Sequence, residues 1–353
     1  MKNSNLPLVV KAVTWSRDSH GLYDYESRNV HKKLIQVTKP CVLTRLGNEV
    51  SQTLSQFDMK QANEIDPLCH IDPVNTDFTV QGCSDTMWMV IRTMRTKYGP
   101  GYLLKEGDTI KLGRVCYKVS LLRSHSDDSL SDKTQDSDES DVEIPNERET
   151  GICRICLNSD SETANPLISP CKCAGSMKYI HLLCLRQWLN SRMQSRVTEN
   201  CITYSWKSID CEICKSCFPF SIGNTGKETE LFKIQKPETP FIVLEGVGND
   251  KNSNRGVHIV SVTNGNDITL GRGHEANVRI SDISVSRCHA TLKFVDGRFL
   301  IEDNNSKFGT LVNICEKIII KPLSSVVVQI GRTVVSFSTR IQQQGIDSND
   351  IMN

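Results

Sequence analysis

The sequence lacks a long run of apolar residues. Across its 353 residues, no window approaches the length of about eighteen apolar residues that a membrane-spanning helix requires. Near the N-terminus, an apolar run covers only residues 6–10 before Lys11 interrupts it, and this is too short for a signal peptide. We therefore expect a soluble protein without a membrane span, located in the cytoplasm, the nucleus or both.

The sequence also lacks an excess of charge of either sign. Its 42 lysines and arginines balance 41 aspartates and glutamates, which leaves a formal net charge of +1. Such a chain creates no overall field that would attract nucleic acid or an anionic membrane. We therefore predict no nucleic-acid partner. The length leaves room for two or three domains, each with a core of its own.

Cysteine, in contrast, is plentiful, with fifteen residues. Seven of them and one histidine form close pairs along residues 153–214, and such pairs are typical of structural zinc, which takes four ligands per ion. Because no secretory signal is present, thiolate chemistry in a reducing compartment explains the pairs better than disulfides. The sequence therefore predicts two Zn²⁺ ions. The expected ligands are Cys153, Cys156, Cys171, Cys173, His181, Cys184, Cys211 and Cys214.

Two protein families share this order of ligands, and the spacing distinguishes them. In histone-reading PHD fingers the histidine follows the fourth cysteine more closely, and a tryptophan stands two places before the seventh cysteine. Here residues 174–180 separate Cys173 from His181, and Ile209 stands two places before Cys211. The stretch therefore resembles a RING-CH (RING-variant) domain of ubiquitin ligases.

The RING-CH resemblance implies how the ligands divide between the two ions. One zinc would take Cys153, Cys156, His181 and Cys184, and the other Cys171, Cys173, Cys211 and Cys214. Each zinc would then have four protein ligands and no open position for water or substrate, so we do not expect metal-assisted hydrolysis. A module this small replaces a hydrophobic core by its metal ions, and the loss of one ligand should unfold it.

The same resemblance implies a surface that binds an E2 ubiquitin-conjugating enzyme. Its contacts would be Ile155, Trp188, Ile213 and the cation of Lys215, which in active RING domains bonds both E2 and ubiquitin. The implied mechanism is non-covalent, because the module would orient E2~ubiquitin for attack and contribute no nucleophile. The alternative is that Trp188 only covers the zinc core and that Lys215 is an ordinary exposed lysine.

Short apolar runs separated by Gly, Asn and Asp turns predict an all-β sandwich over residues 239–341. Within it, Gly271-Arg272, residues 285–290 and residues 303–313 resemble the signature blocks of a forkhead-associated (FHA) domain. FHA domains read phosphothreonine, because a guanidinium and a hydroxyl can converge on one phosphate. By this resemblance Arg272 and Ser286 would grip the phosphate, next to Arg287 and Lys307. Phe308 replaces the usual asparagine that contacts the peptide backbone.

The N-terminal region repeats one part of this pattern. Residues 110–120 align with residues 328–338 without a gap and share Gly-Arg and a final serine. Such a repeat favours two related β domains, although any two amphipathic hairpins share this alternation. We predict a mainly β N-terminal region that, if FHA-like, is degenerate.

The acidic stretch between these regions has ten acidic and three basic residues in 123–149 and is predicted to be disordered. Ser129 and Ser140 suit acidophilic kinases, and a phosphosite here could be read by the FHA domain, which would give self-association. The predicted division is 1–122 (N-terminal β-rich region), 123–149 (linker), 150–220 (RING-CH), 221–238 (linker), 239–341 (FHA) and 342–353 (disordered tail).

These features predict an E3 ubiquitin ligase that binds E2~ubiquitin through the zinc module and recruits phosphothreonine-containing proteins through the FHA domain. Two readings from other classes stay open. A non-enzymatic phosphopeptide-binding adaptor would use the zinc module only for stability or protein contacts. A PHD-like chromatin reader would bind modified histone tails.

Overall fold

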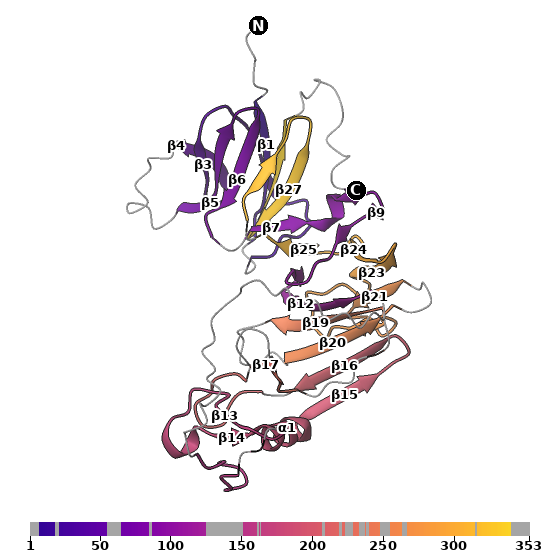
Figure 1. Ribbon diagram of the computed structural model, residues 1–353. Helices are drawn as coiled ribbons and strands as arrows, with labels where there is room; N and C mark the ends of the chain where they lie inside the picture. Colours follow the sequence, from indigo (N-terminus) through magenta and orange to yellow (C-terminus); the bar gives the residue numbers. More distant parts are fainter. Residues whose placement is uncertain are drawn as a thin grey trace. The chain divides into compact units, whose positions relative to one another are not determined.

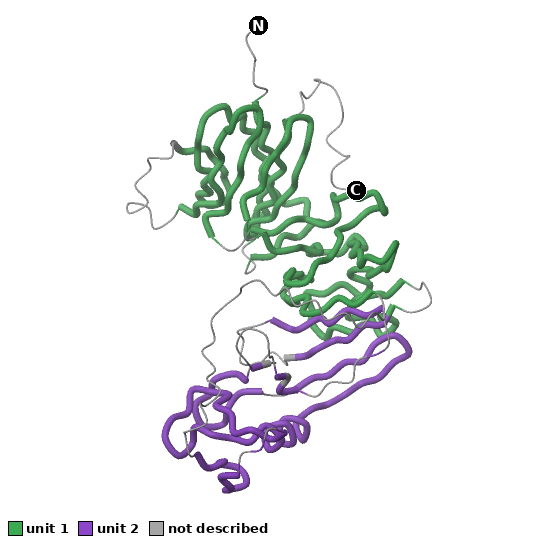
Figure 2. Tube along the Cα trace, viewed as in Figure 1, with its two compact units in different colours: residues 1–124, 262–353 green, residues 125–261 purple. Residues whose placement is uncertain are grey.

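Strands dominate the computed structural model, which confirms the predicted fold class of a mostly β, multidomain protein with a small zinc-type module (Figure 1). The chain forms two compact units, residues 1–124 together with 262–353, and residues 125–261 (Figure 2). The structure describes residues 7–17, 21–54, 65–84, 87–124, 151–160, 162, 164–206, 209–218, 221–222, 229–232, 237, 240–247, 255–262, 267–314 and 316–339.

In the first unit, the N-terminal strands form a sandwich of two sheets around an apolar core. One layer is the run β7-β27-β28-β1-β2, which is the end of a longer sheet, and the other is a sheet with the order β26-β6-β5-β3-β4. Side chains alternate between the faces of a strand, and Leu8 and Val10 of β1 are buried in the same core as Val335 and Phe337 of β28. The bounds are β1 (Leu8–Trp15), β2 (Val30–Val37), β3 (Cys41–Leu46), β4 (Glu49–Leu54), β5 (Ile65–Val74), β6 (Asp77–Gly82), β7 (Met87–Val90), β26 (Ile318–Ile320), β27 (Ser325–Ile330) and β28 (Thr333–Ser338).

A second group of strands in this unit carries the residues of the predicted phosphopeptide site. β11 lies between β12 and β25, and a five-stranded sheet has the order β10-β24-β23-β21-β22. Leu292 and Ile301 face each other across β23 and β24 and are buried. The bounds are β10 (Tyr102–Leu103), β11 (Thr109–Leu112), β12 (Val115–Arg123), β21 (Ile268–Gly271), β22 (Val278–Arg279), β23 (Ala290–Val295), β24 (Arg298–Asp303) and β25 (Thr310–Asn313), and η2 (Ile91–Thr93), β8 (Arg95–Thr96) and β9 (Gly99–Pro100) connect β7 to β10.

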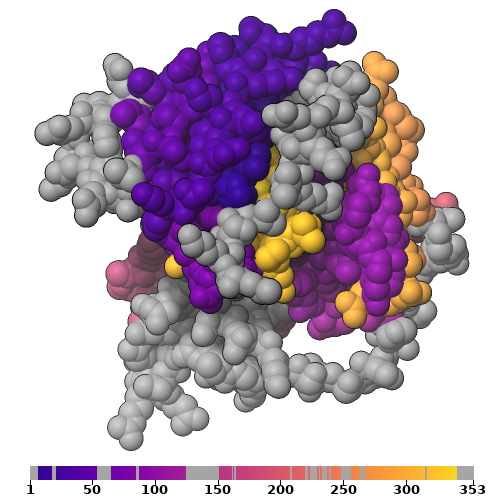
Figure 3. Space-filling view, turned by 90° about the horizontal axis from the view of Figure 1, so that it is seen from above, coloured from indigo at the N-terminus to yellow at the C-terminus, as the bar shows by residue number. Residues whose placement is uncertain are grey.

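The two similar stretches of sequence form hairpins with the same turn. Gly113 and Gly331 begin these turns with φ of 61° and 58°, a conformation that glycine adopts without steric cost and that suits two-residue hairpins. Each hairpin pairs with strands from the other end of the chain, because β28 pairs with β1 and β11 pairs with β25. Figure 1 shows the yellow C-terminal strand β27 beside the indigo N-terminal strand β1, and in Figure 3 yellow C-terminal atoms adjoin indigo and violet N-terminal ones. The two ends of the chain therefore complete each other's sheets.

In the second unit, a hairpin that the sequence analysis did not predict interrupts the stretch of zinc ligands. β15 and β16 lie between Cys184 and Cys211, and β16 pairs with β20, which pairs with β19. Trp206 at the end of β16 is buried and packs edge to face on Phe232, with 4.9 Å between the ring centroids. The bounds are β13 (Leu167–Ile168), η3 (Gly175–Met177), β14 (Ile180–His181), α1 (Leu182–Ser191), β15 (Met193–Val197), β16 (Cys201–Trp206), β17 (Ser221–Ile222), β18 (Thr229–Glu230), β19 (Phe241–Val247) and β20 (Arg255–Ser261).

Within the described part of the chain, no helix has the length and apolar character needed to cross a membrane. Residues 125–150, which include Ser129, Ser140 and nearly all of the predicted acidic linker, lie outside the described residues, and so does the predicted tail. The predictions for these segments stay predictions.

Candidate zinc centre and phosphopeptide site

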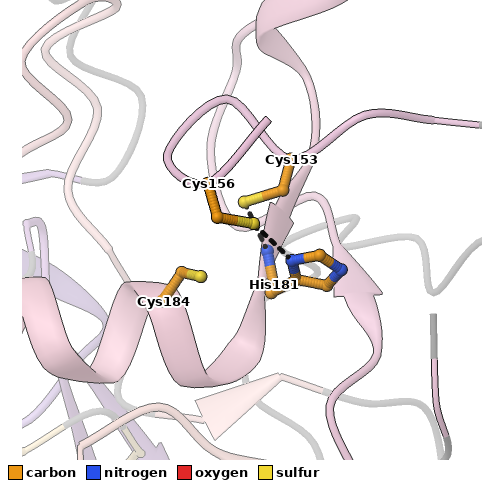
Figure 4. Close-up of side chains that lie close together, drawn as sticks. All are labelled: Cys153, Cys156, His181 and Cys184. Carbon is orange, nitrogen blue, oxygen red and sulfur yellow. Dashed lines mark hydrogen bonds between the residues drawn. The ribbon is translucent and has the colours of Figure 1, made fainter. Parts of the chain in front are cut away.

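The first cluster brings together Cys153, Cys156, His181 and Cys184, whose ligand atoms all lie within 4.8 Å of one another (Figure 4). His181 ends β14, and Cys184 comes from the first turn of α1. Nδ1 of His181 lies 3.1 Å from the Cys156 sulfur, and Nε2 donates to the Asp160 carbonyl at 2.6 Å. Because a carbonyl only accepts, Nε2 carries the hydrogen, and Nδ1 is the nitrogen that faces the other ligands.

The second cluster brings together Cys171, Cys173, Cys211 and Cys214, again with ligand atoms within 4.8 Å. Both sets of four are those that the RING-CH resemblance implied. Burial alone would raise the pKa of Cys214, but hydrogen bonds from the side chain and backbone of Ser216 bring it down to about 6. The thiolate is the form that binds zinc, so this environment favours a metal ligand.

The two Cys-x2-Cys pairs have the same backbone geometry, and we call each pair with its following residue a knuckle. In the first knuckle the N–H of Leu157 donates to the Cys153 carbonyl at 2.8 Å, and in the second the N–H of Lys215 donates to the Cys211 carbonyl at 2.9 Å. Leu157 and Lys215 have φ of 60° and 58°, a left-handed conformation that is uncommon for residues other than glycine. The chain therefore turns back sharply after each pair, which points both sulfurs inward.

Arg154 links the two clusters. It stands between the first two ligands, yet its guanidinium donates to the sulfurs of Cys211 at 3.3 Å and Cys171 at 3.8 Å, and to the Met177 carbonyl at 2.7 Å. Four thiolates around one Zn²⁺ leave an excess of about two negative charges, whereas three thiolates and a histidine leave about one. Arg154 therefore places its charge on the more negative cluster. The sequence analysis did not single out this residue.

We expect Arg154→Gln to weaken zinc retention by the second cluster about 10- to 100-fold, because the loss of a partner that bonds a metal ligand has effects of this size. A chelator titration followed by zinc release should then show one ion leaving much earlier than in the wild type. Lys172→Gln is the matched control, since it removes an exposed positive charge beside Cys171 and leaves the guanidinium bonds in place. Release at the same chelator concentration in both variants would contradict the role of Arg154.

The predicted E2 contacts on the knuckles are exposed. Ile155 and Ile213, each directly before the second cysteine of its knuckle, are 45% and 51% exposed, and Lys215 is exposed as well. Leu157 is 77% exposed and adds an apolar residue that the sequence analysis missed, although its position after Cys156 matches that of Lys215 after Cys214. Apolar side chains presented by rigid turns are what an interface anchor requires.

Trp188 lies on α1 and is half-buried. Its ring packs edge to face on Phe218 with 5.8 Å between centroids, and the Arg192 guanidinium stacks 4.2 Å above it. Arg192 also forms an ion pair with Glu212 of the second knuckle. Trp188 therefore covers part of the module, and Arg192, stacked on its ring, links the helix to the second knuckle. Its predicted contact with an E2 stays a prediction.

Backbone hydrogen bonds bring the four predicted phosphopeptide residues together. The N–H of Arg272 donates to the Ser286 carbonyl at 3.0 Å, and the N–H of Gly273 donates to the Arg287 carbonyl at 3.0 Å. The N–H of Lys307 donates to the Ser286 hydroxyl at 3.1 Å. Since this hydroxyl oxygen accepts here, its hydrogen can be donated to a ligand oxygen. The side chains of Arg272, Arg287 and Lys307 are exposed, so three residues with positively charged side chains adjoin the half-buried Ser286 through their backbone.

His289 holds two of these loops together. Its Nδ1 accepts the N–H of Ser286 at 3.0 Å, and its Nε2 donates to the Gly309 carbonyl at 3.1 Å. Burial lowers the pKa of His289, which keeps the imidazole neutral so that Nδ1 can accept. This geometry makes His289 a brace between the two loops.

Phe308, the departure from the FHA pattern, packs toward the N-terminal half of the chain. Its ring lies 6.4 Å from that of Trp15 and contacts a small core that includes Val13, Tyr23 and Val334. The neighbouring Lys307 places its Nζ atom 3.5 Å from a carboxylate oxygen of Asp24. The aromatic ring thus anchors the loop to strands that precede the FHA stretch in the sequence.

Comparison with known proteins gives two family matches. Residues 153–214 match the family described as RING-variant domain, and residues 268–335 match the FHA domain family. No solved structure matches the chain.

The similar curated proteins are ubiquitin ligases. The E3 ubiquitin-protein ligase MARCHF7 of Pongo abelii is 33% identical over 103 residues, which is 26% of this chain and 14% of that protein. The probable E3 ubiquitin-protein ligase MARCHF10 of Homo sapiens is 31% identical over 93 residues (26% of this chain, 11% of that protein). The probable E3 ubiquitin ligase SUD1 of Arabidopsis thaliana is 40% identical over 75 residues (21% and 5%).

The chain thus spans 14% or less of the length of these three relatives. Both resemblances that the sequence indicated are confirmed by the family matches. The chain contains a RING-variant (RING-CH) domain and an FHA domain, and over the RING region it is a distant homologue of the MARCHF ubiquitin ligases.

Proposed function

We propose that this protein is an E3 ubiquitin ligase that binds E2~ubiquitin through its RING-CH domain and recruits phosphothreonine-containing proteins through its FHA domain. The observation that carries the proposal is the pair of knuckles, each presenting an exposed isoleucine, Ile155 or Ile213, beside a closed set of four metal ligands. Two Zn²⁺ ions, when bound to these sets, would fix the knuckles as a rigid platform.

The catalytic contribution of such a platform is orientation. Ile155, Ile213 and Trp188 would contact apolar depressions of the E2, and the cation of Lys215 would bond E2 and ubiquitin together. Holding a thioester and an attacking lysine in register replaces a bimolecular encounter by an effectively unimolecular one. The chain itself supplies no nucleophile in this mechanism.

Recruitment would come from the FHA domain. Arg272 and Ser286 would bind the phosphate of a phosphothreonine, and Arg287 and Lys307 would add positive charge at its edge. Because both domains belong to one chain, a bound partner's lysines would be kept at a high effective concentration near E2~ubiquitin. A phosphorylated partner would then be modified in preference to its unphosphorylated form.

An autoubiquitination assay with a panel of E2 enzymes tests the ligase activity. We expect Ile155→Ala to reduce transfer about tenfold or more, because truncation of a central interface anchor costs at least 1–2 kcal/mol. Val197→Ala, a truncation of an exposed apolar residue on β15, is the matched control and should leave transfer unchanged. Absence of activity of the wild-type chain with every E2 would instead favour the non-enzymatic phosphopeptide adaptor.

A further inference from the structure

The loop that carries Lys307 is held from outside the FHA stretch. The N–H of Tyr25 donates to the Lys307 carbonyl at 2.9 Å. The Tyr25 ring also lies directly against Gly309, where an added Cβ would come within 2.7 Å of it. Gly309 therefore leaves space for an aromatic ring from the loop between β1 and β2. These contacts join the N-terminal half to the backbone of the recognition loop.

Arg92, in η2, makes a denser set of contacts with the same loop. Its Nε and Nη2 atoms donate to one oxygen of Asp303 at 3.1 and 3.0 Å, and Nη2 also donates to the Ser306 carbonyl at 2.6 Å. The guanidinium carbon lies 4.4 Å above the Tyr25 ring. The side chain of Arg92 is 15% exposed and that of Asp303 is 0% exposed, so this ion pair is shielded from solvent.

Asp303 is the residue around which the loop closes. Its second carboxylate oxygen accepts from the hydroxyls of Ser306 at 2.6 Å and Thr310 at 2.7 Å. A buried carboxylate is strongly unfavourable unless a cation pairs with it, and Arg92 is the cation that bonds this one. Without Arg92 the carboxylate would draw in water or a proton, and the hydrogen bonds that shape the loop up to Thr310 would loosen.

We propose that Arg92 is a positioning residue of the phosphothreonine site and that the N-terminal half of the chain thereby completes this site. The proposal rests on the proposed phosphothreonine binding by the FHA domain. Arg92 does not touch the ligand. It acts by holding the loop in the place where the N–H of Lys307 reaches the Ser286 hydroxyl at 3.1 Å. The match to the FHA family begins at residue 268, so Arg92 lies far outside it.

The test uses the full chain with Arg92→Lys and Arg92→Gln. Lysine keeps the positive charge beside Asp303 and retains the fold, but it cannot hold the carboxylate and the Ser306 carbonyl at once in a planar fork. We expect Arg92→Lys to weaken binding of a phosphothreonine peptide about tenfold and to speed amide hydrogen exchange in residues 304–310. Lys97→Gln, which removes an exposed cation of the same segment whose Nζ atom lies over the Tyr98 ring, is the control and should change neither measurement.

A double-mutant cycle separates positioning from general destabilisation. If Arg92 acts by keeping the N–H of Lys307 on the Ser286 hydroxyl, Arg92→Lys should add little to the loss of affinity that Ser286→Ala already causes, whereas a general loss of stability would add in full. Unchanged hydrogen exchange in residues 304–310 together with unchanged affinity would overturn the proposal. If the wild-type chain binds no phosphothreonine peptide, the proposed function fails, and the exchange rates of the loop still decide whether Arg92 holds it.

Discussion

Cys211→Ser should unfold the zinc module and abolish ubiquitin transfer. Cys211 is fully buried, and its sulfur lies 3.6 Å from that of Cys173 and 3.3 Å from Nη2 of Arg154. Serine is a poor zinc ligand, and structural zinc contributes about 10–16 kcal/mol of apparent binding free energy to the folding of small modules. This contribution is comparable to the whole stability of a typical domain, about 5–15 kcal/mol, so the module should not stay folded once the zinc is lost.

The measurements are zinc content, circular dichroism and autoubiquitination on the same preparation. The wild-type chain should contain two zinc ions, and the Cys211→Ser variant should contain at most one. Cys217→Ser is the matched control, because it is the same exchange in the same loop, outside the set of four. Its sulfur donates to the Phe218 carbonyl at 3.3 Å, a bond that a serine hydroxyl can keep. Two zinc ions and full activity in Cys211→Ser would refute the assigned ligand set.

The Cys217→Ser control has a second use. A cysteine near the last ligand, outside the two sets of four, would give a covalent mechanism if its thiol carried ubiquitin as a thioester. Full transfer by Cys217→Ser would agree with a non-covalent mechanism, in which the module only orients E2~ubiquitin.

The sequence predicted the two clusters of cysteine and histidine well, because residue type and spacing alone are enough to recognise a set of metal-ligand side chains. Cysteine pairs two residues apart can form a turn that directs both sulfurs to one point, and no long-range packing is needed to recognise them. What spacing could not reveal is which nitrogen of His181 faces the other ligands. That depends on the Asp160 carbonyl, which accepts the hydrogen of the other nitrogen.

The pairing of strands that are far apart in the chain could not be predicted from the sequence. The hairpins at 110–120 and 328–338 were visible as alternating stretches with a Gly-Arg turn, but alternation only says that one face is buried, and many strands can cover it equally well. β28 pairs with β1, which lies over three hundred residues away in the chain. This pairing depends on how all the strands around the core pack together. The hairpin formed by β15 and β16 was missed because its exposed outer strand, Met193–Val197, has no apolar alternation.

Phe308 stands where FHA domains usually have an asparagine, and its packing gives a physical reason for the aromatic ring. The sequence alone indicated only that the side chain at this position cannot bond the backbone of a bound peptide as asparagine does. In the structure its ring packs toward Trp15 and the small core beside it, so the position that usually serves the ligand here serves the junction with the N-terminal half. The loop is therefore held by apolar packing at Phe308 and by an ion pair at Asp303, and in the proposed complex other groups would have to bond the peptide backbone.

Arg272→Ala should reduce the affinity for a phosphothreonine peptide roughly a hundredfold. Arg272 follows β21 directly, and its backbone N–H is bound to the Ser286 carbonyl, so its exposed side chain starts from a fixed point beside the Ser286 hydroxyl. A guanidinium can bond two phosphate oxygens at once, and hydrogen bonds to charged groups contribute about 1.5–3 kcal/mol each. The loss of about 3 kcal/mol corresponds to roughly a hundredfold in Kd.

The affinity should be measured by calorimetry with a phosphothreonine peptide library pool and then with single peptides, each paired with its unphosphorylated form. Arg298→Ala is the matched control, because Arg298 is also exposed but lies at the start of β24, at the opposite end of that strand from Asp303. Binding in the Arg272→Ala variant that equals the wild type would defeat the assignment of the phosphate site. Equal losses of affinity in both variants would show that the chain attracts phosphate only through its general surface charge. Paired hydrogen bonds from one guanidinium depend on a single position, whereas the attraction by surface charge changes similarly when any exposed arginine is removed.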